Sequence, residues 1–287
     1  MFIEQLYNSK VTDGREESRR LESPPGFRKS VEEFTSLWRF LRFASSVEPI
    51  GLDGLQDVAL MNRRETKYVL REGDLLDALA PLTSRYRVLE IDGIRIHRYL
   101  SLYFDTPSFF LYHRHRAGGK HRYKVRAREY SDTSLAFLEI KHKISELRTE
   151  KNRIQTPQFL TNLSSEFDEF VQDHFPLPVG ELEPKLLNAY RRITLVGRHN
   201  PERVTLDLGP RFHAGDGHAT LPGIAIAEVK YEGNGRGSDF MRRMREMGIR
   251  PMGFSKYCVG VSMLYPQIKN HYFRPTMRTV RKIMQGD

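Results

Sequence analysis

The chain has 287 residues and a formal net charge of +10, with 46 Lys and Arg against 36 Asp and Glu. This length allows one large domain or two ordinary ones with a buried core, and the excess of positive charge favours an anionic partner: a nucleic acid, a phosphorylated molecule, a phosphate polymer or a membrane surface. The single cysteine, Cys258, excludes an internal disulfide and a cysteine-cluster zinc site, and it fits a reducing compartment.

The first 28 residues are polar and charged, and they contain the helix breaker Pro24-Pro25-Gly26. Because so few of these residues are apolar, residues 1–28 are expected to be disordered. They carry no secretory signal, and no stretch of the chain approaches the roughly 20 apolar residues of a membrane span. We therefore expect a cytoplasmic protein.

Residues 29–56 are predicted to form an amphipathic helix followed by a linker. The helix is expected to run from Ser30, a capping residue with Glu33 three positions on, to Ala44. Its apolar residues at helical spacing are Phe34, Leu37, Trp38 and Leu41. Such a stripe usually packs on its own domain, and peripheral contact with a membrane surface is the alternative.

Strand signals dominate residues 57–265, which are predicted to form the main domain. Alternating segments predict about eight strands, near 61–71, 95–105, 120–130, 135–143, 147–155, 186–196, 202–208 and 223–232. Helices are expected near 73–84, 157–174, 237–247 and 254–264. Many consecutive strands joined by turns favour an antiparallel barrel over a parallel sheet. Residues 266–287 are predicted to form a basic C-terminal tail, for which a solvated segment is preferred over a last helix opened by Pro275.

The segment His121–Tyr130 carries the most informative pattern. Alternate side chains of a strand point to opposite faces of its sheet. One face of this segment therefore carries Arg122, Lys124, Arg126 and Arg128, and the other carries Tyr123, Val125 and Ala127. A single strand of this kind would simply turn its cations toward water.

The same alternation recurs in other predicted strands. Their charged faces add the cations Lys67, Lys141, Lys143, Lys151, Arg153, Arg203 and Lys230. Such a sheet either leaves its charged face open to water or closes, so that the cations line a tunnel. Because crowded like charges repel one another, a tunnel of this kind requires an anion. Triphosphate and polyphosphate are narrow enough for a barrel of about eight strands, whereas a nucleic acid duplex is too wide.

A few carboxylates share these charged faces, namely Glu65, Glu139, Asp207 and Glu228. Carboxylates bind Mg²⁺ or Mn²⁺, which prefer oxygen ligands and commonly bridge protein carboxylates to phosphates. For Glu139 and Asp207, an ion pair with a neighbouring cation is the preferred interpretation. For Glu228, the metal and ion-pair roles both remain open.

At these residues the sequence resembles the triphosphate tunnel metalloenzyme superfamily, and within it the polyphosphate-polymerase domain of vacuolar transporter chaperone (VTC) proteins. The resemblance covers roughly residues 58–264 and rests on short motifs in the family's order. They are Arg63–Tyr68, Tyr103–Thr106, Tyr112-His113, Arg126–Tyr130, Phe137–Lys141, Lys151–Arg153, Tyr190–Arg192, Arg203–Asp207, Glu228–Lys230 and Ser255–Tyr257. Arg63 replaces the first Glu of the Glu-x-Glu-x-Lys motif of the hydrolase branch, which favours the polymerase branch.

The resemblance implies an α+β fold, in which a closed antiparallel β-barrel forms a basic tunnel with helices packed outside. It implies a metal at Glu228 and phosphate contacts from Lys67, Arg126, Arg128, Lys141, Lys151, Arg153, Arg192, Arg203 and Lys256. The alternation adds Arg122, Lys124 and Lys230 as phosphate-binding candidates and Glu65 as a second metal ligand. The residues expected to act directly in catalysis are Lys67, Arg126, Arg128, Arg192 and Lys256.

The first functional hypothesis is a polyphosphate polymerase that uses Mn²⁺ or Mg²⁺ to transfer the γ-phosphate of ATP to a polyphosphate chain. One alternative is a hydrolase of tripolyphosphate or nucleoside triphosphates in the same tunnel, with Glu65 orienting water. Another is a non-catalytic module that binds polyphosphate or inositol phosphates. Specific nucleic-acid binding is not expected, because Tyr123 lies on the face opposite Arg122 and Lys124, whereas base stacking needs aromatic residues among the cations.

Overall fold

The structure is a computed structural model that describes residues 25–56, 63–118, 121–145, 148–233, 235–268 and 273–285. Within these ranges, 11 strands form one sheet whose main path is β2-β11-β9-β8-β4-β5-β6-β7. The strands of this path are β2 (Arg63–Arg71), β4 (His97–Asp105), β5 (Arg122–Tyr130), β6 (Leu135–Lys143), β7 (Thr149–Thr156), β8 (Glu183–Gly197), β9 (Glu202–Ala214) and β11 (Ile224–Glu232). Every neighbouring pair in the path is antiparallel.

Three short strands that the sequence analysis missed flank the main path. They are β1 (Glu48–Ile50), β3 (Tyr86–Leu89) and β10 (Gly217–Thr220). The pair of β1 and β3 is parallel, while β3 with β8 and β10 with β9 are antiparallel. Segments of three or four residues are too short to show a period of two, so no sequence signal marked them.

The predicted α+β class and antiparallel pairing are confirmed, but closure of the barrel is not. The path ends at β2 and β7, and no backbone ladder joins these two strands in the described part of the chain. Strand β7 is mostly exposed, and its Lys151 and Arg153 are typical of an edge strand, where charge discourages further pairing.

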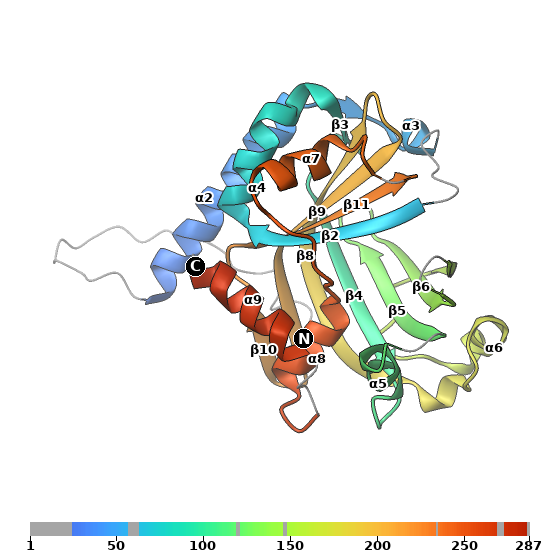
Figure 1. The fold of residues 1–287 in the computed structure, drawn as a ribbon. Coiled ribbons are helices and arrows are strands. Elements are labelled where there is room, and N and C mark those ends of the chain that lie inside the picture. The colour runs from blue at the N-terminus through green and yellow to red at the C-terminus, as the bar shows by residue number, and fades with distance from the viewer. Residues whose placement is uncertain are drawn as a thin grey trace, which may run out of the picture.

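Helices cover the outer face of one half of the sheet, as Figure 1 shows for α2 (Pro25–Ser46), α4 (Glu72–Leu79) and α7 (Asp239–Glu246). Leu75 of α4 and Phe240 of α7 are buried in one cluster with Leu206 of β9 and with Ala227 and Val229 of β11. These strand residues belong to the alternate set opposite the cations. The apolar set therefore faces the helices, as the alternation predicted.

A second apolar layer covers the other half of the sheet. There α6 (Asp168–His174) packs on β5 and β6, with Val171 in one cluster with Val125, Ala127, Leu138 and Ile140. The remaining short elements are α3 (Leu52–Gln56) and the 3₁₀ helices Ala80–Arg85, Ser165–Phe167 and Val179–Glu181.

The inner face of the sheet is filled at one end by helix α8 (Lys256–Leu264). Tyr257, Cys258 and Val261 pack in one cluster with Val69 of β2 and Ile226 of β11. Asp105, the last residue of β4, fixes this arrangement: its carboxylate accepts hydrogen bonds from the hydroxyl of Tyr257 (2.5 Å) and from the backbone N–H groups of α5 (Phe110–Arg116). The charged part of the inner face therefore begins where α8 begins, at Lys256.

The two ends of the chain differ from expectation. Helix α2 begins at Pro25, inside the segment expected to be disordered, so Ser30 lies within the helix and not at its start; residues 1–24 lie outside the described ranges. In place of the solvated tail that the sequence favours, α9 (Arg274–Gln285) packs Val280 into the cluster around α8. None of the described helices combines the length and the apolarity needed to cross a membrane.

Gly260 is predicted to be required for the close approach of α8 to the sheet. A Cβ atom at Gly260 would lie 2.5 Å from Leu186 and 2.7 Å from Phe212, both fully buried. We expect Gly260→Ala to cost about 1–3 kcal/mol of stability through overpacking, more than the gain of up to about 1 kcal/mol in helix propensity. Gly73→Ala in α4, where a Cβ would meet no atom within 4 Å, is the matched control, and its stability should not fall. Thermal unfolding of both variants checks this; equal melting temperatures would contradict it.

Candidate functional site

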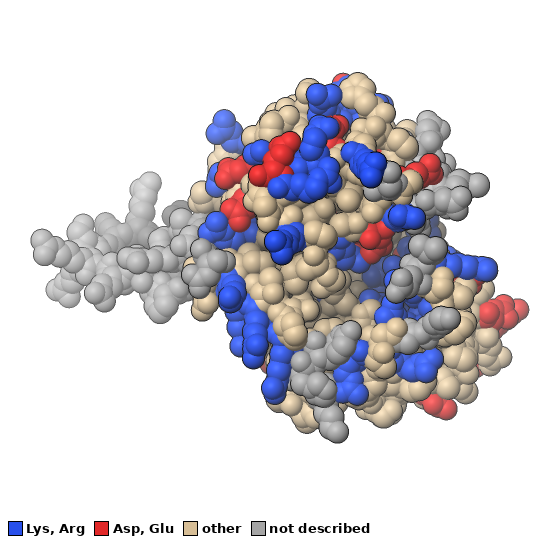
Figure 2. Space-filling model, in the orientation of Figure 1, with Lys and Arg blue, Asp and Glu red and all other residues tan. Residues whose placement is uncertain are grey.

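The cations predicted from the sequence gather on the inner face of the sheet, opposite the helices that cover its apolar face. Figure 2 shows Lys and Arg around a hollow that lies between the positions of β2 and β5 in Figure 1. The strands on the two sides of this hollow are far apart in the main path of the sheet. The hollow is therefore formed by the curvature of one sheet.

Three lysines from neighbouring strands form a row on this face. Lys124 of β5 is in register with Lys141 of β6, and Lys141 with Lys151 of β7. Like charges directly opposite one another destabilise a sheet. Burial, with Lys141 and Lys67 nearby, lowers the pKa of Lys124 to about 8. Burial also lowers the pKa of Lys151 to about 8, although Glu139 contacts its ammonium group.

Glu139 is the carboxylate at the centre of the cations of β5 and β7. It is 1% exposed, and it lies 2.6 Å from Nη2 of Arg126 and 2.6 Å from Nζ of Lys151. Burial acts to raise the pKa of Glu139, but Arg126, Arg128 and Lys151 outweigh it and hold that pKa well below its ordinary value. The ion pair preferred from the sequence for Glu139 is present.

Asp207 of β9 organises a second group of cations. Arg192 of β8 binds it through two hydrogen bonds, Nε to Oδ1 at 2.5 Å and Nη2 to Oδ2 at 2.8 Å, and Lys256 also contacts it. Arg192 and Lys256 lie over the ring of Tyr190, at 5.3 and 4.4 Å from its centroid. The ion pair expected for Asp207 is therefore present as well.

Glu228 and Glu65 form a third group with two lysines. Glu228 of β11 lies 2.8 Å from Nζ of Lys230 and 3.4 Å from Nζ of Lys67, which also contacts Glu65. Burial and Glu228 act to raise the pKa of Glu65, but Lys67 and Lys141 more than offset them. Lys141 belongs to β6 and Glu65 to β2. The effect of Lys141 on the pKa of Glu65 therefore means that charges on the two halves of the sheet interact across the hollow.

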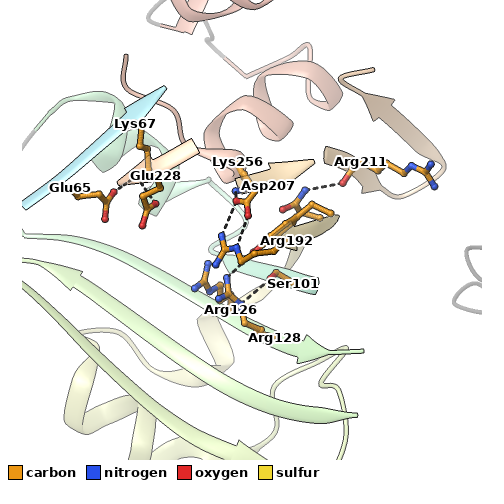
Figure 3. A network of polar contacts seen from close by, with 12 residues as sticks. Glu65, Lys67, Ser101, Arg126, Arg128, Arg192, Asp207, Arg211, Glu228 and Lys256 are labelled. Atoms are coloured by element: carbon orange, nitrogen blue, oxygen red, sulfur yellow. Dashed lines mark hydrogen bonds and ion pairs between the residues drawn. The ribbon is translucent and has the colours of Figure 1, made fainter. Parts of the chain in front are cut away.

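The three groups face a common space. Figure 3 shows Arg126 and Arg128 of β5 pointing toward Arg192 of β8, with Glu65 and Glu228 on the β2 side. Arg192 also helps to hold the pKa of Glu228 well below its ordinary value, against the effect of burial. The catalytic candidates from the sequence thus converge on one space.

The other phosphate-binding candidates differ in position. Arg122 lies opposite Lys143 at the start of β5, and Arg203 opposite Lys230, whose pKa is lowered by burial and by Arg203. Arg153 is exposed on the edge strand β7, with its guanidinium 4.8 Å from the centroid of the Phe137 ring. Arg153 is therefore at the periphery of the site.

Sequence reasoning missed three tyrosines that lie among the cations, Tyr99, Tyr103 and Tyr190. The hydroxyl of Tyr103 accepts a hydrogen bond from Nη1 of Arg126 (3.3 Å). Burial acts to raise its pKa, but Arg126, Lys124 and other cations lower it to about 8. Alternate spacing at Tyr99, Ser101 and Tyr103 is the signal that would have revealed them. Contrary to the expectation from Tyr123, aromatic residues do lie among the cations, although Tyr103 and Tyr190 are each only 5% exposed and offer little open surface to a base.

The carboxylates fit only one kind of divalent-metal site. In the described ranges, no three His, Cys, Asp or Glu residues come together as a potential metal cluster, so a cage made only of protein ligands is not formed. Mg²⁺ and similar ions are often held by one or two carboxylates and completed by substrate phosphates. Glu228 and Glu65, on neighbouring strands beside the cations, fit that second kind of site.

Comparisons with solved structures find distant similarities. A proposed adenylate cyclase from Bacillus halodurans has 13% identity and a TM-score of 0.46, with 68% of this chain and 96% of that chain covered. A proposed adenylyl cyclase from Hippeastrum, described as having a dominant triphosphatase activity, has 18% identity and a TM-score of 0.45, with coverages of 74% and 99%. An RNA triphosphatase from S. pombe has 8% identity and a TM-score of 0.27, with coverages of 94% and 98%.

The family comparison gives the clearest assignment. No curated protein matches the chain. The family model described as the VTC domain matches residues 62–265, which is well over half of the chain and includes every catalytic and metal-ligand candidate named above. The motifs quoted from the sequence lie within this match, and the chain belongs to the VTC domain family.

Proposed function

We propose that this protein is a metal-dependent polyphosphate polymerase, which transfers the γ-phosphate of ATP to the end of a polyphosphate chain bound in the hollow. The observation that carries the proposal is the convergence of Arg126, Arg128 and Arg192 beside a row of three lysines. Their positive charge is larger than the negative charge of the nearby carboxylates. An extended anion with several charges relieves this excess, and a row of cations suits a chain of phosphates.

Phosphoryl transfer depends mainly on position and charge. The bond between the γ-phosphorus and the oxygen of ADP breaks, and a new bond forms to a terminal oxygen of the polyphosphate, so the products are ADP and a chain longer by one phosphate. Because the chain end supplies an anionic oxygen, no strong protein base is required. Arginines bind phosphate oxygens through paired N–H groups, while lysines act as point charges. Arg126, Arg128 and Arg192 would orient the transferred group, with Lys67 and Lys256 beside it.

Glu228 and Glu65 would hold the divalent ion, Mn²⁺ or Mg²⁺, beside the phosphates. When bound, this ion supplies positive charge that neutralises phosphate oxygens. Lys67 and Lys230, which contact Glu228, would then be available to bind phosphate. The candidates Arg122, Lys124, Lys141, Lys151, Arg153 and Arg203 would bind the rest of the polymer.

Hydrolysis in the same site is the second candidate function. It is favoured by Glu65, an ionised carboxylate with a side chain that is 30% exposed at the hollow, because such a group can orient water. Polymerase and hydrolase differ only in whether a phosphate chain or water accepts the γ-phosphate.

The products formed from ATP and Mn²⁺ distinguish the two functions. We expect polymer on a gel, with one ADP for each phosphate added, and no product after the metal is chelated. Arg126→Gln should lower the rate by roughly 10²–10³, the effect of removing one preorganised charge-stabilising donor. Arg148→Gln removes an equal charge from an arginine that is 71% exposed and should leave the rate unchanged. Free phosphate without polymer would support hydrolysis, and neither product under any metal would contradict both functions.

Lys141 is predicted to lower the stability of the free protein and to strengthen anion binding. Because it faces Lys124 and Lys151 in register, Lys141→Met should raise the melting temperature of the free protein, with a gain of roughly 0.2–1 kcal/mol. The same change should weaken tripolyphosphate binding and reduce the stabilisation that tripolyphosphate provides. Thermal shift with and without tripolyphosphate measures both effects. A fall in both the free-protein melting temperature and the affinity would indicate a merely structural lysine.

Tripolyphosphate binding should also weaken as the pH rises through 8. Lys124 and Lys151, each with a pKa of about 8, lose positive charge there, and Tyr103, with a pKa of about 8, gains negative charge. Since the anion binds best when a lysine is protonated, the loss of charge on each lysine between pH 7 and pH 9 should weaken tripolyphosphate binding about tenfold. Calorimetry on the parent protein and on Lys124→Met checks this, because the ligand's own titration is common to both. An identical pH slope in the two proteins would refute the role of Lys124.

A further inference from the structure

Helix α2 packs on the core mainly with Phe40, Phe43 and Ala44, and of the four apolar residues that the sequence pattern singled out, only Leu37 packs against the same cluster. Phe40, Phe43 and Ala44 are buried, at 0%, 9% and 1% exposure. Phe34, Trp38 and Leu41, here called the aromatic stripe, are 70%, 54% and 46% exposed. At about 100° per residue, the three residues of the aromatic stripe lie within about 60° of one another around the helix. One side of α2 is therefore held by the protein, while a compact apolar group points outward.

The aromatic stripe is unusual on this surface. The other large apolar side chains that are exposed in the described ranges are Leu52, Phe110, Leu135, Ile154 and Met284, which belong to five different elements. Exposed apolar residues that occur singly are normal in folded proteins. A group of three on one helix, two of them aromatic, marks a surface that contacts something else.

The charges beside the aromatic stripe are positive. Arg39 and Arg42 are exposed on the same helix, and the guanidinium of Arg42 lies 6.0 Å from the centroid of the Trp38 ring. Between Phe34 and Ser46 the sequence contains no Asp or Glu. An aromatic group beside cations complements a surface that is apolar inside and anionic at its boundary.

We propose that α2 docks this protein on an anionic lipid bilayer, with the aromatic stripe inserted between headgroups and acyl chains and with Arg39 and Arg42 against the headgroups. Tryptophan, phenylalanine and leucine on one face, with arginine beside them, is the composition of helices that lie in the membrane interface. Three side chains are too few for a stable interface between two copies of the chain, which usually buries about 1,200 Å² or more. The helix lies on the membrane and does not cross it. This docking is independent of the proposed polymerase activity.

The chain provides its own probe, because Trp38 is its single tryptophan. Vesicles that contain phosphatidylserine should shift the emission of Trp38 to shorter wavelength and protect it from iodide, whereas vesicles of phosphatidylcholine alone should do so weakly. Phe34→Ser combined with Leu41→Ser should weaken binding to the anionic vesicles at least about tenfold, because two apolar side chains no longer insert. Arg39→Gln combined with Arg42→Gln should weaken it by about tenfold or more.

Leu135→Ser combined with Ile154→Ser is the matched control, since these residues of β6 and β7 are 42% and 41% exposed. This control should bind vesicles like the parent protein. The proposal is overturned if vesicles leave the Trp38 emission unchanged. It is also overturned if the Trp38 emission shifts without vesicles as the protein concentration rises, because such a shift indicates a second copy. Emission that is already shifted and protected from iodide in dilute solution also overturns it, because another part of the chain then covers the aromatic stripe.

Discussion

Unneutralised positive charge on one face of a single sheet is the constraint on which the rest of the structure depends. Three carboxylates, the buried Glu139 and Asp207 and the half-buried Glu228, each contact at least two cations. The groups around Glu139 and Asp207 keep a net positive charge, whereas Glu228 and Glu65 balance Lys67 and Lys230. In the lysine row, Lys124 and Lys141 add further positive charge, while Lys151 contacts Glu139. In the absence of an anion this arrangement is unfavourable, so it is explained by what the hollow binds.

The rest of the fold offsets that cost. The strand residues opposite the cations are buried under helices on both halves of the sheet, and apolar burial contributes roughly 25 cal/mol per Å². Helix α8 contributes both to the apolar packing and to the charged site. Its apolar residues fill one end of the inner face, while Lys256 at its first position reaches Asp207. The position of a catalytic candidate is thus set by the packing of the helix that carries it.

The sequence predicted the eight strands of the main path because each alternates with a period of two over seven or more residues. The same alternation assigned Arg126 and Lys141 to the inner face. Closure could not be predicted in this way, since it depends on how two edge strands approach and not on the pattern within either strand. The inner tyrosines were missed because Tyr103 was considered only as part of a motif, although its alternation with Ser101 places it on the charged face.

Helix α2 shows a different limit of sequence reasoning. The spacing of Phe34, Trp38 and Leu41 predicts a helix correctly, yet the same helix carries a second apolar face with Phe40 and Phe43. Periodicity identifies both faces and does not say which one meets the sheet. The choice is made by the tertiary partners of the helix, which include Leu75 and Leu79 of α4. Three of the four stripe residues that are most conspicuous in the sequence, Phe34, Trp38 and Leu41, therefore remain exposed, while Leu37 packs inward.

The ion pairs of the site also fix the orientation of its arginines. Arg192 gives Nε and Nη2 to Asp207, so the carboxylate occupies one edge of the guanidinium and Nη1 lies on the other edge. Arg126 is held in a similar way by Glu139 and Tyr103. A side chain fixed in this way loses less rotamer entropy when an anion arrives. The carboxylates therefore do more than reduce repulsion, because they also orient the cations that would bind phosphate in the proposed function.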